Sequence, residues 1–328
     1  MDSDIDRVLE AFLAERRQEA TTIDPRLGTL VDELQATVSS GGKRLRPRLV
    51  LWGYRAGGRR LDEPVLRAAA ALELLHTFAL IQDDVMDQSA TRRGRPASHV
   101  TLATLASHEA ARFGESAAIL LGNLALIWAD RLMLDSGFPA PRLEVALAVY
   151  NALRTEVTLG QYLDVLLAHG ERPSEEEALR VDRYKTATYT VQRPIQLGLA
   201  LAGAGAEAIE AVPAYAVPAG IAFQLRDDLL GALGDPERTG KPSGEDLLRR
   251  KPTWLWARTL RLAPDAAEET DLEALRLRVV DSGAAADAET KIHELVAEAL
   301  AAAGRLPVAP ELRDELVAMT EQMAARTS

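Results

Sequence analysis

The chain has 328 residues, and 49 acidic against 38 basic side chains give a formal net charge of −11. Aromatic residues make up only 5% of it, whereas alanine and leucine are abundant, which favours helices over a β-sandwich or barrel. The lack of cysteine excludes disulfides, thiolate metal sites and cysteine nucleophiles. The acidic balance argues against nonspecific binding to nucleic acid or to an anionic membrane surface.

No targeting segment is expected. The first residues are acidic and lack a basic region followed by an apolar run, so they do not predict a signal peptide. The longest apolar stretch, residues 117–129, spans about 13 residues and is interrupted by Gly122 and Asn123, whereas a bilayer span needs about 20 residues. We therefore expect a cytoplasmic protein without a transmembrane segment.

Long helices separated by short Gly- or Pro-containing segments account for most of the chain. The helix of residues 64–86 is apolar nearly all round, which predicts that it is buried. No alternating pattern predicts a strand. We expect one domain, residues 1–328. The expected helices cover residues 4–19, 47–51, 64–86, 102–110, 114–134, 141–168, 175–202 and 217–230, with helical patterning again after residue 253.

Residues 231–252 form the longest irregular stretch, with four glycines and three prolines. Loops of this length inside a compact domain are usually functional lids or linkers. Charged residues directly after an acidic motif favour a lid, and a solvated linker between domains is the alternative.

Three aspartates lie at the end of the apolar helix 64–86. Asp83 and Asp87 are four residues apart and share a face, and Asp84 lies about 100° round from Asp83. Each carboxylate pair at about 4 Å costs about 1 kcal/mol in water and about 4 kcal/mol at an effective dielectric of about 20. A buried helix therefore needs cations here, and oxygen ligands without cysteine or paired histidine suit Mg²⁺. A solvated acidic last turn is the alternative.

A second aspartate pair ends another apolar helix. Asp227 and Asp228 follow Gln224 by three and four residues, so all three share a face. Two acidic clusters on two helices predict opposing walls of one metal pocket, of the kind built between helices of a bundle.

Two basic runs supply matching cations. Residues 43–48 contain four basic side chains after a Gly-Gly pair, and residues 91–95 contain three arginines directly after the first acidic cluster. Arginine forks and lysine point charges suit phosphate oxygens. A surface salt-bridge patch is the alternative for either run alone. Together with the acids, the runs predict Mg²⁺ between carboxylates and a diphosphate.

With these motifs the chain resembles the trans-isoprenyl diphosphate synthases of the polyprenyl synthetase family. The resemblance covers residues 41–253 and rests on GGKRLRP, LLHTFALIQDDVMDQSATRRGRPASH, EVTLGQYLD, YKTATYT and FQLRDDLLGALGDPERTGKP. It implies an all-α fold, an orthogonal helical bundle around a deep central cavity, and a homodimer.

The resemblance also implies residue roles and about three Mg²⁺ per active site. The metal-binding positions are Asp83, Asp84, Asp87, Asp227 and Asp228. Positions that contact the allylic diphosphate are Arg92, Lys185, Thr186, Gln224, Lys241 and Lys251. Positions of the isopentenyl diphosphate site are Gly42, Lys43, Arg46, His76 and Arg93. Gln161 and Asp164 match a supporting polar pair.

The implied reaction ionises a dimethylallyl, geranyl or farnesyl diphosphate, and isopentenyl diphosphate attacks the cation. Asp83, Asp84, Asp87, Arg92, Lys185, Asp227 and Asp228 are the expected catalytic residues. Departures from the family's frequent residues, which leave substrate preference open, stand at Gln82, Asn123, Gln192, Gly231, Arg250 and Pro252.

Product length is expected to depend on Phe78 and Ala79, five and four residues before Asp83. In the family these positions form the floor that limits chain length, and one aromatic with a small neighbour resembles short-chain geranylgeranyl synthases, with farnesyl as the next choice. A class I terpene cyclase is an alternative, although it usually lacks the GGKRxRP segment. A noncatalytic regulatory subunit of a prenyltransferase is the second alternative.

Overall fold

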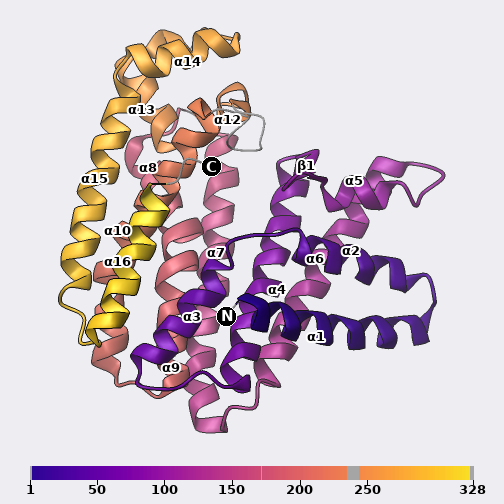
Figure 1. The fold of residues 1–328 in the computed structure, drawn as a ribbon. Coiled ribbons are helices and arrows are strands. Elements are labelled where there is room, and N and C mark those ends of the chain that lie inside the picture. Colours follow the sequence, from indigo (N-terminus) through magenta and orange to yellow (C-terminus); the bar gives the residue numbers. More distant parts are fainter. Residues whose placement is uncertain (1, 171, 235–243, 326–328) are drawn as a thin grey trace. The chain divides into compact units, whose positions relative to one another are not determined.

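The computed structural model describes residues 2–170, 172–234 and 244–325. They form an all-α protein in which the described strands are a single short hairpin (Figure 1). Contacts divide the chain into two compact units, Met1–Tyr54 with Arg59–Leu143, and Arg55–Gly58 with Glu144–Ser328. The single domain expected from the sequence stays a prediction.

In the first unit, α4 is the element on which the others pack. It contacts α1, α2, α5 and α6, and α1 lies beside α2 (Figure 1). The elements are α1 (Asp2–Ile23), α2 (Leu27–Ser39), α3 (Leu45–Ala56), α4 (Glu63–Met86), β1 (Thr91–Arg92), β2 (Arg95–Pro96), α5 (Ser98–Ala103) and α6 (Ala110–Leu134). Helix α3 ends in the second unit.

Local sequence explains how α4 begins and why it is buried. The Asp62 side chain accepts a hydrogen bond from the Val65 N–H, and Pro64 occupies the first turn, where its missing N–H costs nothing. The alanines at 68–71 are fully buried, so neighbouring helices approach closely. The expectation of a buried helix is confirmed, and α4 presents its last turn, with the three aspartates, at one end of the unit.

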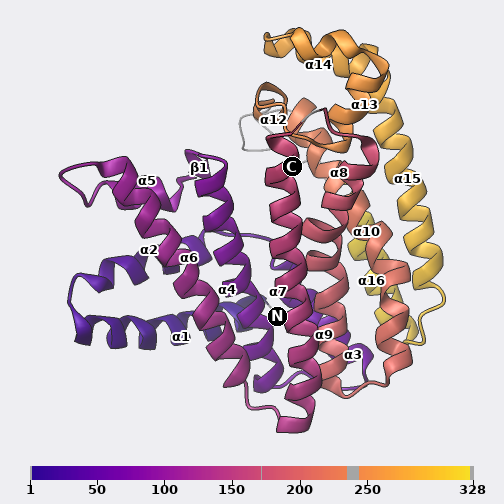
Figure 2. The ribbon, with the colours of Figure 1, turned by 180° about the vertical axis from the view of Figure 1, so that it is seen from behind.

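In the second unit, α10 is central and packs against η1, α15 and α16, as Figure 2 shows from behind. The elements are α7 (Ala140–Ala168), α8 (Glu175–Val181), the π-helix η1 (Asp182–Gln192), α9 (Arg193–Ala202), α10 (Ala206–Leu233), α12 (Glu245–Leu248), α13 (Trp254–Leu262), the 3₁₀-helix η2 (Pro264–Glu268), α14 (Leu272–Asp281), α15 (Ala284–Ala303) and α16 (Pro310–Ala324). Helix α7 begins in the first unit.

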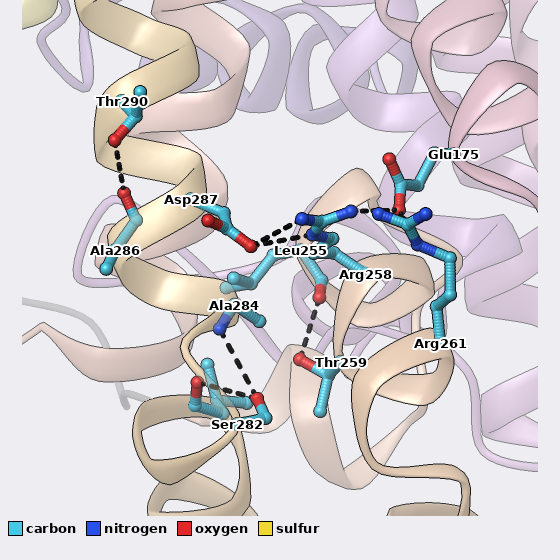
Figure 3. A network of polar contacts seen from close by, with 11 residues as sticks. Glu175, Leu255, Arg258, Thr259, Arg261, Ser282, Ala284, Ala286, Asp287 and Thr290 are labelled. Atoms are coloured by element: carbon cyan, nitrogen blue, oxygen red, sulfur yellow. Dashed lines mark hydrogen bonds and ion pairs between the residues drawn. The ribbon is translucent and has the colours of Figure 1, made fainter.

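Arg258 connects three helices of this unit (Figure 3). From α13 it reaches Asp287 on α15 at 2.7 Å and Glu175 on α8 at 3.3 Å, and Arg261 also reaches Glu175, at 2.7 Å. Beneath these ion pairs the Thr259 hydroxyl donates to the Leu255 carbonyl at 2.8 Å. The side chains therefore fasten α13 beside the apolar core that it shares with α10 and α15.

Several predicted boundaries are wrong. The helix expected over 175–202 is three elements, with a π-helix in the middle, and the one expected over 102–110 ends as α5 at Ala103. Helix α10 begins well before residue 217 because it accommodates Pro213 and Pro218 inside it. Residues 231–252 are not wholly irregular, since they contain the end of α10 and all of α12.

Among the described residues, three helices are long and apolar enough, by length and composition alone, to cross a membrane. They are α4, α6 and α10, with mean hydropathy of 1.4, 1.6 and 1.3. The apolar stretch of residues 117–129, on which the sequence-based expectation rests, is part of α6. Within the structure 61%, 44% and 44% of the three apolar windows are buried. The absence of a transmembrane segment therefore stays a prediction.

Candidate active site

The first acidic cluster is already paired with an arginine. Arg92, in the hairpin, donates from Nε and Nη2 to Asp84 Oδ1 at 2.8 and 2.5 Å, and from Nη2 to Asp83 Oδ2 at 3.3 Å. Burial raises the pKa of Asp84, and the Arg92 guanidinium opposes this shift. Asp87 caps the C-terminus of α4. Asp83, Asp84 and Arg92 thus form one charged group, and their predicted roles in binding metal and diphosphate stay predictions.

The hairpin turn places a second arginine, Arg93, beside the glycine pair Gly41–Gly42. Arg93 and Gly94 have φ of 52° and 72°, as in a tight hairpin turn with two left-handed residues. Arg93 Nη1 donates to the Gly41 carbonyl. A Cβ on Gly42, whose φ is +136°, would lie 3.0 Å from Arg93 Nη2, so glycine is needed there. Two predicted isopentenyl diphosphate residues, Gly42 and Arg93, therefore lie together.

The two basic runs are not uniform phosphate sites. Arg44 is 7% exposed and binds Glu73 Oε1 at 2.5 Å, while Arg95 binds the buried Glu33 at 3.1 Å. The prediction that the whole runs bind phosphate is therefore wrong for these two arginines, because buried carboxylates take their charge. Lys43 remains exposed.

His76 lies in a basic environment on α4. Burial, followed by the positive charges of Arg46 and Arg93, holds its pKa well below 6.5. The imidazole is thus neutral at physiological pH, and a neutral ring can donate one hydrogen bond to an anion without adding charge. Arg46, His76 and Arg93 are within electrostatic reach of one another, as their predicted common site requires.

Predicted residues of the second cluster form a polar chain. The Thr186 hydroxyl donates to Gln224 Oε1 at 2.7 Å, and Gln224 Nε2 donates to Asp228 Oδ1 at 2.8 Å. Lys185 Nζ contacts Asp164 Oδ2 at 2.5 Å. Elements α7, η1 and α10 supply these side chains.

Close helix packing places that chain. A Cβ on Gly160 of α7 would lie 2.6 Å from the Lys185 backbone nitrogen, and one on Gly220 of α10 would lie 2.4 Å from the Ala187 Cα. Glycine at both positions lets α7 and α10 approach the π-helix that carries Lys185 and Thr186. A π-helix is a frequent feature of functional sites.

Asp228 and Asp182 are buried carboxylates, 6% and 7% exposed. Burial first, then Asp246 and Asp227, raises the pKa of Asp228 to about 7, opposed by Gln224 and Lys251. Burial first and then Asp228 raise the pKa of Asp182. Asp182 was missed by the sequence analysis, since a single aspartate in a helical pattern carries no signal of burial.

The donor set fits a magnesium–diphosphate group. Oδ2 of Asp228 and Oδ2 of Asp182 are buried without a hydrogen-bond partner, and such oxygens are costly unless a cation or donor reaches them. Across residues 2–170, 172–234 and 244–325 no three His, Cys, Asp or Glu side chains form a ready metal cage. Mg²⁺ needs none, because it binds through one or two carboxylates plus substrate phosphates and water.

The remaining predicted residues lie within the described part of the chain, with one exception. Gln161 stands three residues before Asp164 on α7, Asp227 precedes Asp228 on α10, and Lys251 acts electrostatically on Asp228. Lys241 lies outside the described residues. The convergence of the two acidic clusters stays a prediction.

Comparisons with known proteins place this chain among the prenyltransferases. The polyprenyl synthetase model matches residues 28–291. The geranylfarnesyl diphosphate synthase of Aeropyrum pernix is 33% identical over 294 residues, which cover 85% of this chain and 88% of the relative. The (2E,6E)-farnesyl diphosphate synthase of Mycobacterium bovis is 34% identical over 245 residues, which cover 72% and 64%.

A solved structure shares the fold closely. The geranylgeranyl pyrophosphate synthase of Corynebacterium glutamicum, in complex with isoprenyl diphosphate and magnesium, is 35% identical to this chain. The two superpose with a TM-score of 0.94 over 98% of this chain and 97% of that one.

The fold and the aspartate motifs thus define an all-α trans-prenyltransferase. The chain belongs to the polyprenyl synthetase family.

Proposed function

We propose that this enzyme condenses isopentenyl diphosphate with an allylic diphosphate to make a short-chain all-trans isoprenyl diphosphate, with Mg²⁺ as cofactor. Geranylgeranyl diphosphate is the proposed product, and farnesyl diphosphate is the next candidate. The observation that carries the proposal is the chain Thr186–Gln224–Asp228, which ends on a buried carboxylate oxygen without a partner.

In this proposal, one group of side chains binds the allylic diphosphate and another binds isopentenyl diphosphate. Arg92, Lys185, Thr186, Gln224 and Lys251, with Lys241, bind the allylic diphosphate, supported by Gln161 and Asp164. Gly42, Lys43, Arg46, His76 and Arg93 bind isopentenyl diphosphate. The aspartates Asp83, Asp84, Asp87, Asp227 and Asp228 hold about three Mg²⁺, as in the resemblance.

Charge stabilisation is the main catalytic effect that these residues provide. When bound, the metal neutralises the leaving pyrophosphate as a Lewis acid. Arg92 and Lys185 donate charge-assisted hydrogen bonds to the oxygens whose negative charge grows as the allylic C–O bond breaks. The isopentenyl double bond attacks the resulting cation, and the released pyrophosphate takes the proton. No side-chain base is required.

The deciding experiment is a product assay. The purified protein is incubated with Mg²⁺, isopentenyl diphosphate and, in turn, dimethylallyl, geranyl or farnesyl diphosphate, and chain length is read by chromatography. Elongation with at least one starter is expected, and its absence with all three would refute the proposal. A cyclic hydrocarbon formed from geranylgeranyl diphosphate alone would indicate a terpene cyclase.

Product length provides a separate prediction. Phe78 and Ala79 lie one turn before Asp83 on α4, about 6–7.5 Å along the helix axis. If Phe78 limits the growing chain, Phe78→Ala should lengthen the product with the same starters. Leu277→Ala, which truncates an exposed apolar residue of α14, is the control and should leave product length unchanged. Identical product distributions for Phe78→Ala and the parent protein would contradict the assignment.

We also propose a cytoplasmic homodimer in which α6 contacts a second copy. Phe113, Leu120, Ile127 and Leu134 are exposed and recur every seven residues on this helix, so they form one continuous apolar stripe. Exposed apolar stripes of this kind mark contacts with protein or membrane. The net charge of −11 favours a protein partner over an anionic lipid surface.

A further inference from the structure

Gly231 occupies the position at which the second acidic cluster could hold a third carboxylate. It follows Asp227 by four residues and Asp228 by three, so all three positions share one face of α10. Gly231 is one of the departures from the family's frequent residues named above. This chain therefore supplies only two acids of the motif from α10.

The structure fills the missing position from another element. A Cβ built on Gly231 would lie only 2.7 Å from Oδ2 of Asp246, which is closer than a real Cβ comes to another atom. Asp246 belongs to α12, and the Gly244 N–H just before that helix donates to the Gly231 carbonyl at 2.7 Å. The Asp246 carboxylate thus lies in the space that a side chain at position 231 would take.

Charge links Asp246 to the same cluster. Its negative charge acts, with that of Asp227, on the carboxyl group of Asp228. Oδ2 of Asp228 is buried and has no hydrogen-bond partner, so it requires a cation or a donor. The Asp246 carbonyl also accepts from the Lys251 N–H at 2.9 Å, which ties a predicted diphosphate residue to the same turn.

We propose that Asp246 is the third acid of the second cluster and binds the water ligands of a diphosphate-bound divalent cation, in place of an aspartate at position 231. Contact through water fits because no three acids of the described residues converge on one point, and Mg²⁺ keeps several of its waters. Gly231 then provides the space that Asp246 needs. The inference rests on the proposed function, since it concerns the same metal–diphosphate group.

Thermal denaturation of the full chain tests this role without measuring turnover. The protein is melted in inorganic pyrophosphate at increasing Mg²⁺, and the Mg²⁺ concentration at half-maximal stabilisation is determined. Asp246→Asn keeps the shape and removes the charge, and should raise this midpoint by about 10- to 100-fold, as for other residues that orient metal ligands. Glu268→Gln, which removes an exposed acid of η2, should keep the parent midpoint.

A relocated carboxylate gives the sharper result. Asp246→Ala should raise the Mg²⁺ midpoint as Asp246→Asn does. Gly231→Asp combined with Asp246→Ala should bring the midpoint most of the way back to the parent value. Gly231→Asp alone places two carboxylates in one space and should lower the melting temperature without Mg²⁺. An unchanged midpoint in Asp246→Asn, or no recovery in the combined variant, would overturn the role of Asp246. If the parent protein itself shows no Mg²⁺-dependent stabilisation, the proposed function fails instead.

Discussion

The basic side chains of residues 43–48 divide by burial rather than by sequence. Arg44 is buried against Glu73, and its Nη2 donates to the Val38 carbonyl at 2.9 Å, whereas Lys43 is exposed. A basic run predicts positive charge on a segment, but it does not show which charges a buried carboxylate on another helix will take. The phosphate-binding role of this segment stays a prediction, and the sequence missed the structural role of Arg44.

Replacement of Arg44 tests that structural role. Arg44→Met leaves the Glu73 carboxylate buried without its partner, so the free energy of unfolding should fall by about 3–5 kcal/mol. Arg44→Met with Glu73→Leu removes both charges and should recover most of the loss, because neither burial penalty remains. Urea unfolding of the parent protein and of both variants measures the difference. Equal losses in the single and double variants would contradict a buried ion pair.

Asp228 should make the metal-free protein less stable as the pH rises. Burial raises its pKa to about 7, so the folded state retains a proton that the unfolded state has lost above about pH 4. The free energy of unfolding therefore falls as the pH rises from about 4 to about 7, and it stays low at higher pH. Asp228→Asn cannot ionise and should melt at a higher temperature than the parent protein in chelator, with a larger gain at about pH 8 than at about pH 5.

The same substitution should abolish turnover, since the amide replaces an expected metal ligand. Melting curves in chelator at the two pH values, together with the product assay, measure both effects. A gain in melting temperature that does not depend on pH would contradict the ionisation of a buried Asp228. Glu268→Gln, at an exposed position, should show no pH-dependent gain.

At the scale of elements, the sequence predicts helices better than their irregularities. The long apolar periodicity of α4, α6 and α7 made these helices predictable to within a few residues. The π-helix η1 was not, because its geometry depends on close packing against α7 and α10 rather than on local propensity. Likewise Gly160 and Gly220 look like ordinary helix interruptions in the sequence, and only the three-dimensional contacts show that they admit η1.

The contact at Gly160 carries a prediction. Gly160→Ala would place a methyl group 2.6 Å from the Lys185 nitrogen, so α7 and η1 must separate. Overpacking of this kind costs about 1–3 kcal/mol, and the shift should weaken the ion pair between Lys185 and Asp164. We expect a lower melting temperature and a lower kcat, from thermal denaturation and the product assay.

Gly205→Ala is the matched control for this substitution. Gly205 has a negative φ, and a Cβ there would meet no atom within 4 Å. This variant should retain the parent kcat, although stability should fall by about 0.5–1 kcal/mol because alanine is a poorer helix N-cap than glycine. Similar losses in both variants would show that the contact with η1 is not the cause.

At the scale of the whole molecule, the sequence was sufficient for the fold class and for the family. The all-α composition and the ordered motifs predicted both. What it could not supply were partners from distant elements, such as Glu73 for Arg44 and Asp246 beside Gly231, since each depends on how helices far apart in the chain pack. The apolar stripe of α6 is a further case, because its exposure is a property of the folded chain.

That stripe predicts the state of association. Leu120 and Ile127 are 64% and 60% exposed, and covering such side chains removes apolar surface from water at about 25 cal/mol per Å². Ile127→Glu would bury a charge in the proposed interface, so it should convert a dimer into a monomer, as measured by sedimentation velocity. Leu277→Glu changes an equally exposed apolar residue on α14, also 60% exposed, and should leave the dimer intact. A parent protein that is monomeric but floats with lipid vesicles would show that the stripe binds membrane, and dimers of unchanged stability in Ile127→Glu would place the interface elsewhere.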